Sequence, residues 1–109
     1  MNLVEKLNYK RIINIEELKE GTISVLCKTK EEYYSLMKYL HNKGIRWASG
    51  DIAYKYIPMN LKEQKKPIYI RIQKHKKNNM YDNGYCYRIY YDTYNRGLKT
   101  YDLKEIKLI

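Results

Sequence analysis

One amphipathic helix with clear start and stop signals is the feature that most constrains the fold of this 109-residue chain. Residues 29–32, Thr-Lys-Glu-Glu, form a capping box, in which the threonine hydroxyl accepts a hydrogen bond from the backbone of Glu32. The apolar residues that follow are spaced i, i+3, i+4 and i+7 and form one stripe: Tyr33, Leu36, Met37 and Leu40. Gly44 then supplies a left-handed C-terminal stop. The sequence therefore predicts a helix over about 30–43 whose stripe packs on a sheet.

Segments of alternating apolar and polar residues lie on both sides of this helix and predict the strands of that sheet. In 22–28, apolar residues occupy alternate positions and share one face. The clearest later strands are 68–73 and 85–91, which carry arginine and tyrosine on a polar face. Further strands are expected at 45–48, 52–57 and 98–101, and the tail 102–109 favours a strand over a capped helical turn.

The connecting segments carry turn and capping signals. Residues 12–21 predict a short helix or turn with Asn14 as its N-cap and Gly21 as its end. The other connections are a lysine-rich loop at 59–66, a polar segment at 74–84 with a tight turn at Asp82-Asn83-Gly84, and a turn over 92–97. The pattern predicts an α+β fold: an antiparallel or mixed sheet of four to six strands with one main helix, about 30–43, packed on one face.

The size of the chain suits one domain, expected over 1–109. A chain of 13.3 kDa can bury roughly two thirds of its unfolded surface around a single core. No apolar run approaches the roughly 20 residues of a membrane span. The first residues also lack the continuous apolar stretch of a secretory signal. We therefore expect a cytoplasmic protein without membrane contact.

The basic charge gathers in the second half of the chain. The formal net charge is +10, of which residues 53–109 carry +8 and residues 1–52 carry +2. Residues 62–77 hold seven lysines and arginines against a single acid, Glu63. A/T-rich coding would also raise the lysine content, but it does not explain fourteen tyrosines beside no phenylalanine. Because a phenol suits half-exposed positions and interfaces, charge and tyrosines together indicate an anionic partner.

Seven of the fourteen tyrosines fall within residues 81–101, where arginine and lysine are interleaved with them. Lysine and arginine would hold phosphates while tyrosine stacks on bases. If strands 68–73 and 85–91 are antiparallel neighbours, Arg71 and Arg88 lie on one polar face. The candidate residues for binding nucleic acid or another partner are Lys65, Lys66, Tyr69, Arg71, Lys74, Lys76, Lys77, Arg88, Tyr90, Tyr94, Arg96 and Lys99.

The sequence contains no strong catalytic motif. Its cysteines and histidines, Cys27, Cys86, His41 and His75, lack the short spacing of a structural zinc site, so two buried thiols are expected instead. His41 is expected at the helix boundary and His75 in a solvated loop, although His75 could serve as a base in RNA cleavage. Trp47 is expected to anchor the core. We predict no catalytic residue, no metal and no cofactor.

Residues 25–50 combine three local patterns: a strand ending in Cys-x-Thr, a helix opening with Lys-Glu-Glu-Tyr, and Gly44 followed by Ile-Arg-Trp-Ala-Ser-Gly. This quarter of the chain resembles a diffuse group of small bacteriophage and mobile-element proteins with a strand–helix segment followed by Gly-x-x-Trp-x-Ser-Gly. The resemblance implies a small α+β fold and a phage setting, without a shared activity or catalytic residue. Many such phage proteins, anti-CRISPR proteins among them, act in counter-defence, which adds that role by analogy.

The function favoured by the sequence is non-enzymatic binding in the cytoplasm of a bacterial host. A small counter-defence, anti-CRISPR-like inhibitor would engage RNA, DNA or a nucleoprotein complex through a basic, tyrosine-rich face. One alternative is a small ribonuclease toxin or nucleotide-degrading enzyme that uses His75 or His41. Another is a protein-only inhibitor whose tyrosines meet an acidic patch on a host defence protein. The oligomeric state stays open.

Overall fold

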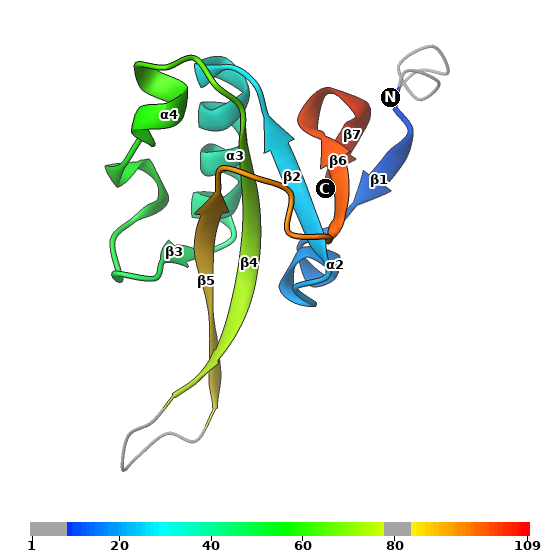
Figure 1. Cartoon of the computed structure of the whole chain (residues 1–109). Coiled ribbons are helices and arrows are strands. Elements are labelled where there is room, and N and C mark those ends of the chain that lie inside the picture. Colours follow the sequence, from blue (N-terminus) through cyan, green and yellow to red (C-terminus); the bar gives the residue numbers. More distant parts are fainter. Residues whose placement is uncertain (1–8, 78–83) are drawn as a thin grey trace.

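A mixed sheet forms the centre of the fold (Figure 1). The computed structural model describes residues 9–77 and 84–109. Within these residues, five strands follow one another across the sheet in the order β3 (Arg46–Trp47), β5 (Tyr85–Asp92), β4 (Ile68–Lys76), β2 (Ile23–Cys27) and β6 (Lys99–Asp102). β4 is antiparallel to β5 and β2, whereas β3 and β6 run parallel to their neighbours. The predicted α+β class, with a sheet of four to six strands, is confirmed.

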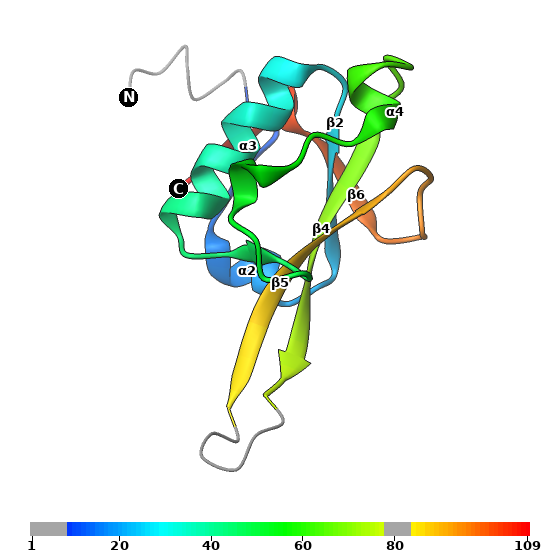
Figure 2. The ribbon, with the colours of Figure 1, turned by 90° about the vertical axis from the view of Figure 1, so that its left-hand side faces the viewer.

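The main helix, α3 (Lys30–Asn42), covers one face of this sheet (Figure 2). Thr29 Oγ1 accepts a hydrogen bond of 3.1 Å from the backbone N–H of Glu32, as the capping box predicts. The predicted stripe is buried against apolar side chains of β2 and β4: Tyr33, Leu36, Met37 and Leu40. The predicted helix is therefore confirmed. Neither α3 nor any other helix of the described residues is long and apolar enough to span a bilayer.

A shorter helix, α2 (Ile15–Lys19), precedes β2. The Asn14 side chain accepts a hydrogen bond of 3.0 Å from the backbone N–H of Glu17, which confirms the predicted N-cap. After the helix, Gly21 has a φ of +78°, and a Cβ there would lie 3.3 Å from the carbonyl oxygen of Ile72. This positive φ and close approach favour glycine at the position.

The two ends of the chain meet in a second, two-stranded sheet. β1 (Arg11–Ile13) pairs in parallel with β7 (Ile106–Leu108), so the first residues of the predicted 12–21 helix belong to a strand instead. Between β6 and β7, Asp102 Oδ1 accepts a hydrogen bond of 3.1 Å from the backbone N–H of Lys104 and caps the 3-10 turn η2 (Leu103–Glu105). The C-terminal tail therefore contains both a capped turn and the expected strand.

The predicted strand over 52–57 is wrong. A turn of 3-10 helix, η1 (Ala53–Lys55), occupies this segment. Trp47 Nε1 donates a hydrogen bond of 3.0 Å to the carbonyl of Ala53, and the Tyr33 hydroxyl donates one of 2.6 Å to the carbonyl of Tyr56. These bonds from buried side chains hold the segment against α3 instead of in the sheet.

The predicted loop over 59–66 is wrong for its first four residues. They form a short helix, α4 (Met59–Lys62), which begins directly after Pro58. Leu61 is only 2% exposed, so one apolar side chain anchors this turn to the core while the neighbouring lysines stay exposed. The lysine-rich composition predicted a loop, because only one leucine in this segment indicates a buried helical turn.

The β4–β5 hairpin is longer than predicted. Residues 74–76 were expected in a polar connection but extend β4, because each pairs with a residue of β5: Lys74 with Tyr87, His75 with Cys86 and Lys76 with Tyr85. Tyrosine favours strands through cross-strand packing. The far end of the hairpin projects from the body of the protein (Figures 1 and 2). Asp82 and Asn83 of the predicted turn lie outside the described residues.

The face of the sheet opposite α3 is called the outer face. Its side chains come from alternate positions of the hairpin: Tyr69, Arg71, Gln73 and His75 on β4, and Cys86, Arg88, Tyr90 and Asp92 on β5. Segment 93–98 crosses over β4 and β2 to connect the parallel strands β5 and β6, and Figure 1 shows this crossing in orange. The polar face expected on the hairpin is therefore partly covered by the crossing segment.

We expect Leu40→Ala to lower the free energy of unfolding by about 2–5 kcal/mol, because Leu40 is 1% exposed and its removal leaves a cavity beneath α3. Thr29→Ala should cost about 1 kcal/mol through loss of the N-cap. Urea unfolding followed by circular dichroism measures both. Lys38→Ala, on the exposed side of α3, serves as the control and should change stability by less than about 0.5 kcal/mol. An unchanged midpoint for Leu40→Ala would contradict this packing.

Candidate nucleic-acid interface

The cluster of basic residues at 62–77 does not form one patch. Lys65 and Lys66 precede the first residue of β4, whereas Lys74, Lys76 and Lys77 lie at its other end. The eight steps of β4 separate these groups by about 26 Å. The expected continuous binding surface is therefore divided into two sites at opposite ends of the strand.

The hairpin register confirms that Arg71 and Arg88 share the outer face. Arg71 lies opposite Tyr90 and Gln73 lies opposite Arg88. The same register places Lys74 and Lys76 on the other face of the hairpin. The polar connection predicted from residue 74 onward is therefore wrong for these two lysines, which belong to a strand and lie on the face opposite the arginines.

Asp92 forms ion pairs with two of the predicted cations. Arg71 Nε lies 2.9 Å from Asp92 Oδ2, and these side chains are only 13% and 9% exposed. Arg96 Nη1 lies 3.2 Å from Asp92 Oδ1. Arg71 also donates a hydrogen bond of 2.7 Å to Gln73 Oε1. Because the donors of Arg71 are engaged within the protein, we assign it to holding the crossing segment on the sheet and not to binding phosphate.

Tyr90 is engaged on the outer face by two neighbours. The guanidinium carbon of Arg71 lies 4.8 Å from the centroid of the Tyr90 ring, and the His75 ring lies nearly parallel to it at 5.6 Å. The Tyr90 hydroxyl and His75 Nε2 are 2.6 Å apart. The expectation of a solvated loop histidine is therefore wrong: His75 lies on β4, half-buried and bonded to Tyr90.

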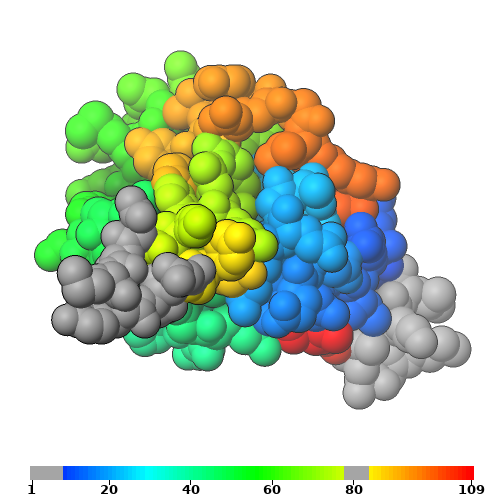
Figure 3. Space-filling model, turned by 90° about the horizontal axis from the view of Figure 1, so that it is seen from below, coloured from blue at the N-terminus to red at the C-terminus, as the bar shows by residue number. Residues whose placement is uncertain are grey.

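The distal part of the hairpin, residues 73–77 and 84–88, is called the arm. It carries four cationic side chains, Lys74, Lys76, Lys77 and Arg88, and no aspartate or glutamate occurs among these ten residues. Lys74 Nζ lies 4.0 Å from the centroid of the Tyr85 ring, which combines a cation with an exposed aromatic face. Figure 3 shows the arm in yellow-green and yellow beside the blue α2.

Six ion pairs join two described residues, and all six lie outside the arm. They join Lys10 to Glu105, Arg11 to Glu17, Lys19 to Glu16, Lys28 to Asp102, and both Arg71 and Arg96 to Asp92. Lys74, Lys76 and Arg88 have no acidic partner in the part of the chain that the structure describes. Within the described residues, no acid therefore neutralises the charges of Lys74, Lys76 and Arg88.

The three remaining candidate residues lie away from the arm. Tyr69 lies opposite Asp92, at the other end of the hairpin. Tyr94 belongs to the crossing segment and is 63% exposed. Lys99 begins β6, opposite Ile23, and its Nζ lies 5.8 Å from the centroid of the Tyr101 ring. The structure therefore places these side chains at separate points, whereas Lys74, Lys76, Lys77 and Arg88 all belong to the arm.

The cysteines and histidines do not assemble into a metal site. Within residues 9–77 and 84–109, no three histidine, cysteine or acidic side chains cluster as ligands. Cys27 is fully buried, and burial raises the pKa of its thiol to about 12. Cys86 is only half-buried, opposite His75, so the expectation of two buried thiols is wrong for it. His41 is exposed at the end of α3, 5.1 Å from the ring of Tyr54.

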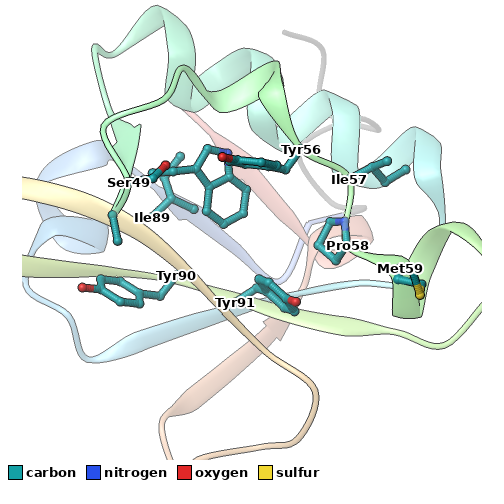
Figure 4. Close-up of a pocket in the computed structure, with 10 residues that line it drawn as sticks. Ser49, Tyr56, Ile57, Pro58, Met59, Ile89, Tyr90 and Tyr91 are labelled. Atoms are coloured by element: carbon teal, nitrogen blue, oxygen red, sulfur yellow. The ribbon is translucent and has the colours of Figure 1, made fainter.

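An aromatic cleft that the sequence did not indicate lies beside β5 (Figure 4). It has a volume of about 490 Å³ and includes Trp47, Tyr56 and Tyr91 in its wall. Trp47 is 6% exposed, which confirms its expected role in the core. The alternation of β5 put Tyr91 on the buried side. Because β3 ends at residue 47, however, the edge of β5 beside Tyr91 is open and 42% of that residue is exposed.

No model of a known protein family, no curated protein sequence and no solved structure matches this chain. The resemblance of residues 25–50 to small phage proteins therefore rests on its motif alone. Trp47 and Gly44 of that motif have structural positions, since Trp47 is buried and Gly44 ends α3 with a φ of +77°. The functional argument has to come from the geometry of the described residues.

The two cysteines should differ strongly in reactivity. We expect iodoacetamide to alkylate Cys86 in the folded protein and to modify Cys27 at least about 100-fold more slowly, because Cys27 is 0% exposed and its thiolate is disfavoured. Mass spectrometry of timed samples measures both rates, with urea-unfolded protein as the control in which the rates converge. Equal rates in the folded protein would contradict the burial of Cys27 and the position of Cys86.

Proposed function

We propose that this protein binds nucleic acid through the arm of its β4–β5 hairpin. The observation that carries the proposal is the projecting two-stranded ribbon with four cationic side chains and no acid among residues 73–77 and 84–88. Phosphate groups are the commonest partners of such cations, and a two-stranded ribbon fits the major groove of a duplex.

The distribution of charge indicates that the cations of the arm bind phosphate and do not serve solubility alone. Asp92, the acid at the opposite end of the hairpin, is paired and holds both Arg71 and Arg96. Lys74, Lys76 and Arg88 lack such partners among the described residues, so a polyanion would meet them without first displacing a carboxylate. Exposed cations attract phosphate over roughly 8–10 Å at physiological salt.

The biological role proposed with this activity is non-enzymatic counter-defence. The phage-like motif around Trp47 supports this setting by resemblance. A small protein that occupies nucleic acid with its arm would obstruct a host nucleoprotein complex acting on the same strand. Survival of phage on a host carrying a nucleic-acid-guided defence system, compared with and without this protein, tests the role separately from binding.

Salt dependence tests the arm. We expect log affinity for a fluorescent oligonucleotide to fall linearly with log salt, and the triple variant Lys74→Gln, Lys76→Gln, Arg88→Gln to lower that slope by about 2–3. Each replaced cation removes one contact that releases about 0.7–0.9 counterion. Fluorescence anisotropy over a salt series measures the slope for single-stranded and duplex probes.

A variant with the same change of charge elsewhere controls for net charge. Lys30→Gln, Lys38→Gln and Lys43→Gln replace three exposed cations of α3 and its C-cap, none of which belongs to the arm. This variant should keep the parent slope within about half a unit. If the arm variant and the α3 variant shift the slope equally, the arm is not the interface, and a protein-only partner becomes the better proposal.

A second candidate function is metal-independent RNA cleavage. The observation that favours it is the distance of 2.6 Å between His75 Nε2 and the Tyr90 hydroxyl, next to the cations of the arm. A histidine in that position could take the proton of a ribose 2′-hydroxyl as a general base. We place this candidate second because His75 and Tyr90 bond to each other, which leaves no second proton-transfer group toward a substrate.

We expect His75→Ala to keep oligonucleotide affinity within about threefold, because the proposed phosphate contacts come from the lysines and the arginine of the arm. Neither the parent nor the variant should release product from a labelled RNA in the presence of a chelator. Gel analysis after prolonged incubation measures this, with Tyr90→Phe as the matched variant that keeps the ring and loses the hydroxyl. Cleavage by the parent that both variants abolish would establish the enzyme and overturn the binding-only function.

A further inference from the structure

We propose that the aromatic cleft beside β5 receives one unstacked base of a single-stranded nucleic acid. This inference rests on the proposed function and adds a preference for single strands to it. The cleft opens between β5 and segment 48–59 and has a volume of about 490 Å³. Pockets that bury small ligands have volumes of about 300–1,000 Å³. A purine or pyrimidine is a ligand of this class.

The walls of the cleft are flat aromatic rings. The rings of Tyr56 and Tyr91 stand nearly perpendicular to that of Trp47, at interplanar angles of 83° and 85°. Their centroids lie 5.9 and 6.3 Å from that of Trp47. Figure 4 shows Tyr56 and Tyr91 on opposite sides of the opening, with Pro58 on a third side. Tyr56 is 44% exposed and Tyr91 is 42% exposed, so both present ring surface to a ligand.

Hydrogen bonds hold this arrangement before any ligand binds. The Tyr56 hydroxyl donates a hydrogen bond of 2.5 Å to Asp51 Oδ2, and the Ser49 hydroxyl donates one of 2.9 Å to the same oxygen. The bond from Tyr56, and then that from Ser49, holds the pKa of Asp51 below its usual value. Asp51 therefore stays ionised at neutral pH and fixes the Tyr56 ring. A fixed ring loses little freedom when a base stacks on it.

The charge around the cleft suits a strand of nucleic acid. Arg46 and Arg88 are register partners at the end of the cleft nearest the arm. Arg46 donates a hydrogen bond to the carbonyl of Gly50, and neither arginine has an acidic partner within the described residues. Asp51 is the counter-charge on this rim. Two cations against one acid favour a phosphate-bearing ligand over an acidic peptide.

The arm and the cleft are continuous along β5. Arg88 and Tyr91 are three residues apart, a distance of about 10 Å along the strand. The two side chains lie on opposite faces of β5, but β3 covers the edge of β5 only at residues 88 and 89. A nucleic-acid strand whose phosphate contacts Arg88 can therefore place a neighbouring base at Tyr91 by crossing this open edge. An aliphatic peptide side chain would gain only burial in this cleft, whereas a base also stacks on an aromatic ring, and stacking contributes about 1–3 kcal/mol per base.

Trp47 provides a direct readout because it is the only tryptophan of the chain. The probes are a single-stranded oligothymidine and an abasic oligomer of the same length and charge. We expect both to bind with equal salt slopes, since both contact the arm. The oligothymidine should bind about 5- to 100-fold more tightly, and it alone should quench the emission of Trp47.

Variants at Tyr91 separate stacking from simple apolar contact. Tyr91→Phe keeps the ring and should retain the parent affinity for oligothymidine within about twofold. Tyr91→Ala and Tyr91→Leu should both lower it by about 5- to 100-fold, to the level of the abasic oligomer. Tyr34→Ala, which removes a 46% exposed tyrosine on α3, is the matched control and should bind like the parent.

The outcomes distinguish the two proposals. Equal affinity of the parent for both oligomers, with an unchanged salt slope, would overturn base binding in the cleft and leave the arm function intact. Parent-like affinity of Tyr91→Leu for oligothymidine would also overturn base binding in the cleft. Leucine keeps apolar surface but has no ring, so the cleft would then need only apolar contact, as a site for a peptide side chain does. If neither oligomer binds at low salt, both proposals are overturned together.

Discussion

The antiparallel pairing of β4 with β5 is the constraint on which the rest of this structure depends. Their register pairs Tyr69 with Asp92 at one end and Lys76 with Tyr85 at the other. Side chains alternate between the two faces of a strand, so a slip of one residue would exchange the faces of β5 relative to β4. Ile89 would then leave the core beneath α3, and Asp92 would move away from Arg71. The register therefore determines both the packing and the charge pattern.

The ion pair between Arg71 and Asp92 on the outer face depends on this register. Both side chains are largely buried, and removing one partner would leave the other charge unpaired in a poorly solvated place, which is costly. Asp92 also binds Arg96 of the crossing segment, so one carboxylate connects two strands and the connection between β5 and β6. At the end of the hairpin near Asp92 both arginines are thus paired with an acid, whereas Lys74, Lys76 and Arg88 of the arm have no acidic partner among the described residues.

Much of the fold was predictable because its signals are local. The capping box at Thr29, the stripe ending at Leu40 and the glycine at position 44 specify α3 without reference to any other element, and the structure confirms them. The predicted strand over 52–57 failed because its structure depends on distant donors. The indole of Trp47 and the hydroxyl of Tyr33 donate hydrogen bonds to the backbone of this segment. No pattern within residues 52–57 predicts those donors.

The sequence predicted which types of residue form the candidate site, but it did not predict which of them share one surface. Alternation correctly placed Arg71 and Arg88 on one face, yet it could not show that Asp92 neutralises Arg71, because that contact depends on the register between strands. Lys74 and Lys76 were predicted in a loop because lysine-rich segments are typical of loops. Their strand pairing depends on tyrosines of β5, which are distant in the sequence.

The missed cleft has a different physical origin. It exists because β3 is only two residues long, so that β5 keeps an open edge beside Tyr91 while Trp47 still reaches the core. A longer β3 would cover that edge with backbone and close the cleft. The short strand is in turn set by the turn at residues 48–51, where the N–H of Gly50 bonds to the carbonyl of Trp47 and Gly50 has a φ of +92°. The same turn that ends the pairing therefore leaves the aromatic rings exposed next to the cations of the arm.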